Sequence, residues 1–184
     1  YYLLIENTRD LSLSNINFSN KFVIIYRNNT KVENLSKLIK FRQNCKVKRI
    51  DFYVSNNVKL MKLLKADGLY ISSYNRDLSL LKLKYTQYKL IGSAHNLAEI
   101  QQKTLQGCTH ILVSRLFKTV YRDKKDFLGT IKFNLLKRKK NANLVPLGGI
   151  RLTNLNKLNF VDCKSFAILS EVKKKPAKII SRLL

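Results

Sequence analysis

Short runs of apolar, β-branched and aromatic residues recur along the whole chain, separated by longer and more polar segments. Each run is about as long as a strand buried on both faces, and several are unbroken rather than alternating, which is typical of parallel sheets. We therefore predict eight strands, at Tyr2–Ile5, Phe22–Tyr26, Ile50–Val54, Gly68–Ile71, Lys89–Gly92, His110–Val113, Leu144–Leu147 and Phe166–Leu169.

Most of the segments between these runs have the spacing of an amphipathic helix. The predicted apolar stripes are Leu35, Leu38 and Ile39; Val58, Met61 and Leu64; Leu97, Ile100, Thr104 and Leu105; Ile131, Leu135 and Leu136; and Ile179, Ile180, Leu183 and Leu184. Asn56 or Asn57 would cap the second of these helices, and Asn96 the third. Strands that alternate with helices predict βαβ units and a parallel sheet.

Eight such units can close into a barrel or lie open as a doubly wound sheet. No glycine-rich dinucleotide fingerprint follows the first strand, which counts against the open nucleotide-binding sheet. At 184 residues a barrel would be a small one. The segments Thr8–Asn20 and Asp77–Tyr88 are too short or too polar for full helices, which counts against a barrel. We predict an α/β protein with one domain, residues 1–184, folded as a single small (β/α)8 TIM barrel.

The composition is that of a globular protein, with 45% hydrophobic residues. No apolar run approaches the roughly 20 residues that a membrane-spanning helix needs, and no signal peptide is evident. We therefore expect a cytoplasmic protein without membrane contacts. The three cysteines, Cys45, Cys108 and Cys163, form no CxxC pair and match no zinc spacing, so we expect buried, reduced thiols.

The charge is strongly positive, because 36 lysine and arginine residues outnumber 11 acidic residues and give a net +25. Such a charge attracts polyanions. The lysines are scattered over nearly every segment, however, and the dense basic runs at 137–140 and 173–175 are short and fall near predicted helix ends. We interpret these runs as solvated helix faces in preference to a nucleic-acid site.

Candidate chemistry is expected at the carboxyl ends of the strands, where barrels of this kind place their active residues. Gly148 and Gly149 follow the seventh predicted strand, and Ser170 follows the eighth. Backbone amides exposed by glycine next to a helix N-terminus form the usual phosphate site of a barrel. These residues predict a phosphate-binding rim, although the glycine pair by itself is also compatible with a plain tight turn.

Five segments resemble, in order along the chain, the motifs of one known family. The family motif Ala-Asp-Gly-Val-His is resembled by Lys65–Tyr70, and Gly-x-Ser-x-His by Ile91–His95. The longer motif Gly-Ala-Asp-Tyr-Val-x-x-Gly-Pro-Ile-Phe-Pro-Thr is resembled by Gly107–Thr119. The last two motifs, Ile-Gly-Gly-Ile-Thr-x-x-Asn and Gly-Val-Ala-Val-Ile-Ser-Ala-Ile, are resembled by Leu147–Asn154 and by Ser165–Val172. Each motif is weak alone, but their order and spacing are specific. The chain resembles a divergent member of the thiamine phosphate synthase family, which includes the related thiazole tautomerases.

This resemblance implies a role in thiamine biosynthesis, namely the coupling of hydroxymethylpyrimidine diphosphate to thiazole phosphate with release of pyrophosphate. By position, it implies that Ser93 and Arg122 are catalytic residues at the diphosphate. It also implies binding of the small phosphorylated substrates by Arg27, Asn56, Thr119, Gly148, Gly149, Leu169 and Ser170.

The chain departs from the family pattern where the family binds magnesium. The family's Asn-Asp pair after the third strand falls on Ser55 and Asn56, and its second metal-binding aspartate falls near Asn75. A hard cation prefers carboxylates over amides. A family lysine after the second strand falls on Asn29, and the place of the tautomerase histidine is taken by Arg115. Metal-dependent activation of the leaving group is therefore expected to be weak.

Two alternatives to an active synthase stay open. The first is a catalytically impaired paralogue that binds a phosphorylated ligand, and the second, less favoured, is a basic nucleic-acid-binding protein, which would need its cations on one face. Oligomer formation is possible in each case. His95 ends the fifth strand, where a packing role behind Ser93 is slightly favoured over acid–base chemistry; His110 and Asp67 are interpreted as structural, Asp67 through its turn.

Overall fold

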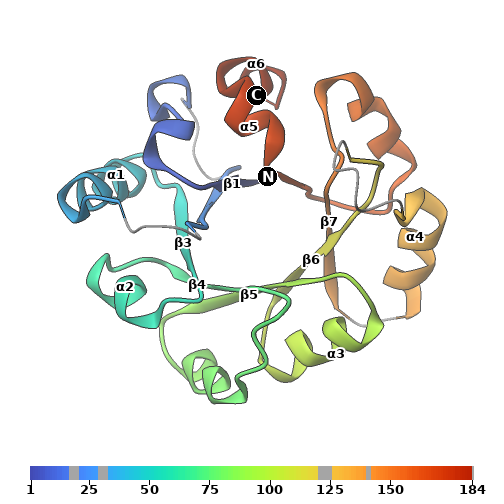
Figure 1. Ribbon diagram of the computed structural model, residues 1–184, viewed down its shortest axis with the longest axis horizontal. Coiled ribbons are helices and arrows are strands. Elements are labelled where there is room, and N and C mark those ends of the chain that lie inside the picture. Colours follow the sequence, from blue (N-terminus) through green and yellow to red (C-terminus); the bar gives the residue numbers. More distant parts are fainter. Residues whose placement is uncertain (17–20, 29–32, 120–125, 140–141, 184) are drawn as a thin grey trace. The chain divides into compact units, whose positions relative to one another are not determined.

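The computed structural model describes residues 1–16, 21–28, 33–119, 126–139 and 142–183, in which strands alternate with helices (Figure 1). The strands are β1 (Tyr2–Ile5), β2 (Val23–Tyr26), β3 (Asp51–Ser55), β4 (Gly68–Ile71), β5 (Lys89–Ala94), β6 (His110–Ser114), β7 (Asn143–Leu147) and β8 (Ala167–Ile168). All eight coincide with predicted strands to within two residues at each end.

Helices of two kinds follow the strands. The α-helices are α1 (Leu35–Val47), α2 (Val58–Leu63), α3 (Leu97–Leu105), α4 (Gly129–Lys139), α5 (Ser170–Lys174) and α6 (Pro176–Leu183). The 3-10 helices are η1 (Thr8–Asp10), η2 (Leu13–Asn15), η3 (Leu78–Tyr85) and η4 (Leu152–Phe160). The segments predicted to be too lean for α-helices thus form short 3-10 helices in their described parts.

The strands are hydrogen-bonded in chain order, β1 to β8, in a closed barrel. Every described strand pair is parallel, for example Ile24 of β2 opposite Phe52 of β3, and Gly92 of β5 opposite Ile111 of β6. The small (β/α)8 barrel predicted from the sequence is confirmed. Its strands are mostly buried along their whole length, which is why they read as unbroken apolar runs.

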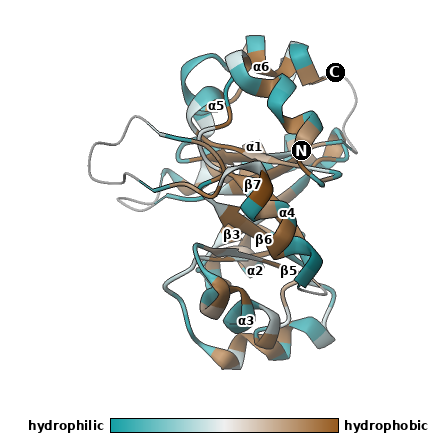
Figure 2. Cartoon of the chain, turned by 90° about the vertical axis from the view of Figure 1, so that its right-hand side faces the viewer, coloured by the Kyte–Doolittle hydropathy of each residue, from teal (hydrophilic) through white to brown (hydrophobic). Residues whose placement is uncertain are grey.

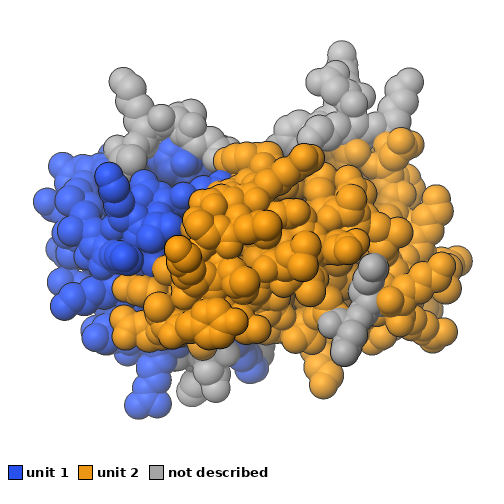
Figure 3. All heavy atoms as spheres, turned by 90° about the horizontal axis from the view of Figure 1, so that it is seen from below, with its two compact units in different colours: residues 1–70, 168–184 blue, residues 71–167 orange. Residues whose placement is uncertain are grey.

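The chain divides into two compact units, one of residues 1–70 with 168–184 and the other of residues 71–167 (Figure 3). In the first unit, α1 and α2 pack on β3 and α5 packs on β1, while Ile179 and Ile180 of α6 are fully buried. In the second unit, α3 packs on β5 and β6 through Ile100, and α4 packs on β7 through Phe133. Figure 2 shows β6 and β7 as hydrophobic and the helices as mixed in polarity.

The predicted apolar stripes are wrong in part for three helices. On α1 the buried residues are Leu38, Phe41, Arg42 and Cys45, while Leu35 and Ile39 are exposed. On α3 the buried residues are Ile100 and Lys103, while Leu97 and Leu105 are exposed. On α4 the buried residue is Phe133, while Ile131 and Leu135 are exposed. The contact with the strands decides which face is covered, and in α3 the covered face includes a lysine that no hydrophobic periodicity can indicate.

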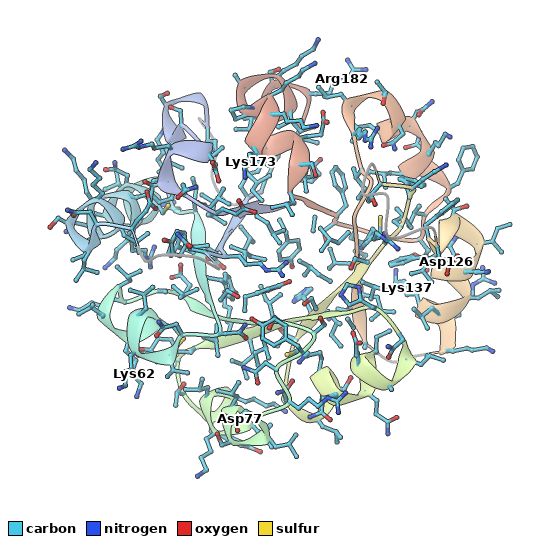
Figure 4. All side chains as sticks on the ribbon, viewed as in Figure 1. Lys62, Asp77, Asp126, Lys137, Lys173 and Arg182 are labelled. Carbon is cyan, nitrogen blue, oxygen red and sulfur yellow. The ribbon has the colours of Figure 1, made fainter. Side chains whose placement is uncertain are left out.

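The positive charge is spread over several elements. Lys62, Lys137, Lys173 and Arg182, labelled in Figure 4, come from four different helices. Lys137 is paired with Asp162 at 2.8 Å and Lys173 with Glu6 at 2.7 Å, so each dense basic run has a local acidic partner. This agrees with the interpretation of the runs as solvated helix ends. None of the described helices is long and apolar enough to cross a membrane.

The three cysteines are free thiols, and Cys45 is buried. Burial raises the pKa of the Cys45 thiol and that of the Cys108 thiol to about 12. Both therefore stay protonated at neutral pH. The predicted burial is confirmed for Cys45, whereas Cys108 and Cys163 are only partly buried.

His110 at the start of β6 makes the stability of the fold dependent on pH. Its burial, and secondarily the charge of Lys89, hold the pKa of His110 below its ordinary value of 6.5. Between these two pKa values the unfolded chain binds a proton that the folded chain does not. Stability should therefore be complete above pH 6.5 and fall as the pH drops from there towards the folded pKa. The free energy of unfolding in urea should differ less between pH 7.5 and pH 5 in His110→Gln than in the unmodified protein. An equal difference in the two proteins would contradict this account.

Candidate active site

Polar residues gather at the carboxyl ends of β5, β6 and β7, which are neighbours in the second unit. The register places Ala94 of β5 opposite Val113 of β6, and Ser114 of β6 opposite Leu147 of β7. Because the carboxyl ends of paired parallel strands meet at one edge, the residues that follow these strands share a rim. Ser93 lies just inside this rim and is almost fully buried, with 6% of its surface exposed.

His95 and Ser114 form a hydrogen-bonded pair on this rim. His95 Nδ1 lies 2.9 Å from Ser114 Oγ and 3.1 Å from the Ser114 carbonyl oxygen. A carbonyl can only accept, so this geometry favours the imidazole tautomer with hydrogen on Nδ1 and leaves Nε2 as the acceptor. The backbone of His95 is held as well, since its N–H donates to Glu99 Oε2 at 2.7 Å. Sequence reasoning singled out His95 but missed its partner Ser114, which is distant in the sequence.

The loop between β6 and α4 is tied down at both of its ends. The Leu116 N–H donates to the Leu147 carbonyl, and the Phe117 N–H donates to the Gly148 carbonyl, which extends the pairing of the two strands beyond their ends. Arg115 spans the loop, because its guanidinium donates to the Asp126 carbonyl at 2.6 Å and to Thr119 Oγ1 at 3.4 Å. Arg115 thus contacts Thr119, a predicted substrate-binding residue whose place at the phosphate site stays a prediction.

The glycine pair after β7 is required by the close approach of this loop. Gly148 and Gly149 have φ values of +91° and +72°, a conformation that strongly favours glycine. A Cβ atom at Gly149 would lie 2.4 Å from the carbonyl oxygen of Phe117, and one at Gly148 would lie 3.1 Å from Arg115 Cγ. The turn is locked from its other side by Asn154, whose Nδ2 donates to the Gly149 carbonyl at 2.8 Å.

The predicted residues of the first unit lie at the ends of its own strands. Arg27 follows β2 and its N–H donates to the Ile5 carbonyl at 2.8 Å. Asn56 follows β3 with a positive φ of 53°, and its N–H donates to the Tyr70 carbonyl at 2.9 Å. Leu169 and Ser170 stand where β8 passes into α5, and Ser170 is exposed. All four are at carboxyl ends of strands, as predicted, but their convergence with the glycine pair stays a prediction.

Comparison with known proteins assigns the chain to a family. The family model described as thiamine monophosphate synthase matches residues 17–172. The chain belongs to this family. It is 28% identical over 70% of its length to a thiamine-phosphate synthase of Prochlorococcus marinus strain SARG, and 28% identical over 83% of its length to the thiamine-phosphate synthase of Pelagibacter ubique.

The solved structures agree with this fold. A thiamine phosphate pyrophosphorylase from Pyrococcus furiosus superposes with a TM-score of 0.71 over 100% of this chain and 96% of that chain, at 14% identity. A 3-keto-L-gulonate-6-phosphate decarboxylase from Vibrio cholerae superposes with a TM-score of 0.61 at 13% identity, over 100% and 97% of the two chains. The chain spans 37–42% of the length of three Prochlorococcus relatives and 78% of that of the Pelagibacter relative.

The residues of this family member do not fit the magnesium ion that the family resemblance implies. Asn56 and Asn75 offer only neutral amide oxygens where the pattern expects carboxylates, and the described residues contain no cluster of three or more histidine, cysteine, aspartate or glutamate side chains. Asn75 Oδ1 instead accepts the Asp77 N–H at 3.0 Å and closes a turn. Two further positions of the family pattern, Asn29 and Arg122, lie outside the described residues.

Asp67 is structural, as predicted, but its carboxylate acts through bonds to α1 and β3 rather than through its turn. Its Oδ1 pairs with the largely buried Arg42 at 3.0 Å, and its Oδ2 accepts the Phe52 N–H at 2.7 Å. Arg42 also donates to the Lys65 carbonyl through two nitrogens. These bonds join α1, β3 and the start of β4, and they occupy both carboxylate oxygens of Asp67.

The glycine turn yields a stability prediction with a matched control. Gly149→Ala introduces both a left-handed alanine, which costs about 1–2 kcal/mol, and a collision with the Phe117 backbone. Gly129 also has a positive φ, of +71°, but a Cβ there would meet nothing within 4 Å. Gly149→Ala should lower the free energy of unfolding by at least about 1 kcal/mol more than Gly129→Ala, measured by urea titration, because overpacking adds to the strain. Equal losses of unfolding free energy in the two variants would mean that the Phe117 backbone moves away from the new Cβ atom without a cost in stability.

Proposed function

We propose that the chain is a thiamine phosphate synthase that couples hydroxymethylpyrimidine diphosphate to thiazole phosphate and releases pyrophosphate, with little dependence on magnesium. The observation that carries this proposal is the glycine turn at Gly148–Gly149, locked against the loop that presents Thr119, in a member of the thiamine monophosphate synthase family. That arrangement is the one expected of a phosphate-binding rim.

The reaction asks the protein mainly to hold anions and to balance a departing charge. The carbon–oxygen bond to the diphosphate breaks, the bonding pair leaves with pyrophosphate, and the thiazole nitrogen attacks the pyrimidine methylene carbon. We assign Arg27, Ser93 and Arg122 to the diphosphate. The thiazole phosphate is assigned to the residues Thr119, Gly148, Gly149, Leu169 and Ser170. Because preorganised charge lowers the barrier most where charge develops, arginines near the leaving group are the groups expected to matter most.

A catalytically impaired paralogue that binds a phosphorylated ligand is the second candidate function. The observation that favours it is the pair Asn56 and Asn75, which replaces carboxylates by amides. Loss of one electrostatic contact to a transition state typically lowers the rate by about 10²–10³. Binding and turnover must therefore be measured separately. The nucleic-acid alternative is less well supported, because the cations come from many elements and at least three of them are paired with acids.

Pyrophosphate release from the two purified substrates, with and without magnesium, is the direct assay. We expect slow turnover that magnesium changes less than about threefold, since no strong carboxylate site holds the ion. The double variant Asn56→Asp with Asn75→Asp should raise both the rate and its dependence on magnesium. A charge-matched control, Asn44→Asp with Gln101→Glu, changes two exposed helix positions and should leave both unchanged.

Two outcomes would contradict the proposal. Fast turnover that depends strictly on magnesium would show that the metal positions have been assigned wrongly. Binding of thiazole phosphate or pyrophosphate without turnover in every variant would identify the chain as the impaired paralogue.

A further inference from the structure

One lysine of α3 is a fully buried cation. Lys103 has 0% of its surface exposed. Its ammonium group donates to the carbonyl oxygen of Asn75 and, at 2.8 Å, to Oε1 of Gln106. Both acceptors are uncharged, so these bonds compensate only part of the free energy that removing a charge from water costs. A fully buried ammonium whose described hydrogen bonds go to neutral oxygens is unusual, because buried lysines are normally paired with a carboxylate.

The face of α3 around Lys103 binds three consecutive carbonyl groups of one loop. Gln102 Nε2 donates to the Arg76 carbonyl at 3.2 Å, and Gln106 Nε2 donates to the carbonyls of Asn75 at 3.1 Å and Asp77 at 2.9 Å. The donors stand at neighbouring positions of the helix surface and at its C-cap. The loop they hold connects β4 to η3 and belongs to the same unit as α3. We call Gln102, Lys103 and Gln106 the α3 clamp.

The clamp is built against the strand that carries Ser93. A Cβ atom at Gly92 of β5 would lie 2.8 Å from Lys103 Cγ and 3.0 Å from Cys108 Sγ. The glycine therefore makes room for the aliphatic stem of the lysine. Gly92 immediately precedes Ser93 in β5, so the lysine stem packs on this strand one residue away from a predicted diphosphate residue.

We propose that Lys103 is a positioning residue that fixes the β4–η3 loop for binding of a diphosphate. The loop carries Asn75, which stands where the family pattern has a metal-binding aspartate. In this chain the ammonium group of Lys103, which binds the loop from the side of α3, holds the β4–η3 loop in place. The inference rests on the proposed function for its ligand, whereas the clamp itself is tested without any substrate.

Hydrogen exchange is the readout for the clamp. The amides of Asn75, Asp77 and Ser79 donate to acceptors within the loop, so their exchange reports opening of the loop. Lys103→Met keeps the length of the stem and removes the donor. It should raise exchange of these amides at least tenfold, whereas Gln101→Met on the exposed side of α3 should not change it. Unchanged exchange in folded Lys103→Met would overturn the clamp.

The pH dependence of stability separates the charge of Lys103 from its bulk. Burial lowers the pKa of Lys103 below its ordinary 10.5, an effect to which Arg76 adds and which Cys108 and Glu99 oppose. Between the two pKa values the unfolded chain binds the extra proton, so stability should rise with pH in this alkaline window. That rise should be smaller in Lys103→Met. An equal rise in both proteins would mean that the ammonium is not the buried group that titrates.

Calorimetric titration with inorganic pyrophosphate then tests the positioning role. Lys103→Met should weaken binding at least fivefold, and Lys103→Gln, which keeps one donor, should restore part of the loss. If Lys103→Met does not fold, Gln102→Leu removes only the Arg76 contact and should give a smaller change in the same direction. Faster exchange with unchanged affinity would refute the positioning role. Failure of the unmodified protein to bind pyrophosphate would instead overturn the proposed function, and hydrogen exchange would still decide on the clamp.

Discussion

The close contact between Gly149 and the carbonyl of Phe117 is the constraint on which the rim of the second unit depends. No side chain fits at Gly149, where a Cβ atom would lie 2.4 Å from that oxygen. The contact keeps the end of β7 against the loop that follows β6, and Arg115 and Thr119 are placed by the same loop. A rim built from closely packed backbone is rigid, and rigidity is what the binding of a phosphate through backbone groups requires.

The chain orders its strand ends with neutral amides, backbone carbonyls and its own cations. Asn75 closes a turn, Asn154 locks the glycine pair, and the α3 clamp holds the carbonyls of the β4–η3 loop. Carboxylates, which the family pattern uses for magnesium, are replaced at the corresponding positions. With a net charge of +25, the chain can attract a diphosphate without a divalent ion, and this is the physical basis of the activity that we propose.

The sequence predicts the barrel well because its signal is local and repeated. Strands buried on both faces appear as unbroken apolar runs. The described residues around Thr8 and Asp77 form no full α-helix, as predicted, but the sequence does not predict their 3-10 helices. The helix faces are predicted less well. The burial of Lys103, for example, depends on the space above Gly92, which the lysine stem fills. No periodicity carries that information.

In the candidate site, too, the local features could be predicted from the sequence and the contacts in space could not. Strand ends and the glycine pair are evident from the sequence, since their residue types and order are characteristic. Contacts between segments that are apart in the sequence are not evident. The pairing of Ser114 with His95 depends on the register of β5 and β6, and the bond from Arg115 to the Asp126 carbonyl depends on how the two ends of its loop approach each other. Such pairs become visible only when the strands are aligned in space.

Calorimetric titration of hydroxymethylpyrimidine diphosphate, once with magnesium and once with EDTA, tests the central claim most directly. The account predicts binding in both conditions with dissociation constants that agree to within about threefold, since a tenfold change would require about 1.4 kcal/mol of contribution from the metal. Binding that disappears in EDTA would contradict it, because the diphosphate would then be held through a magnesium ion rather than by the protein's own cations and backbone.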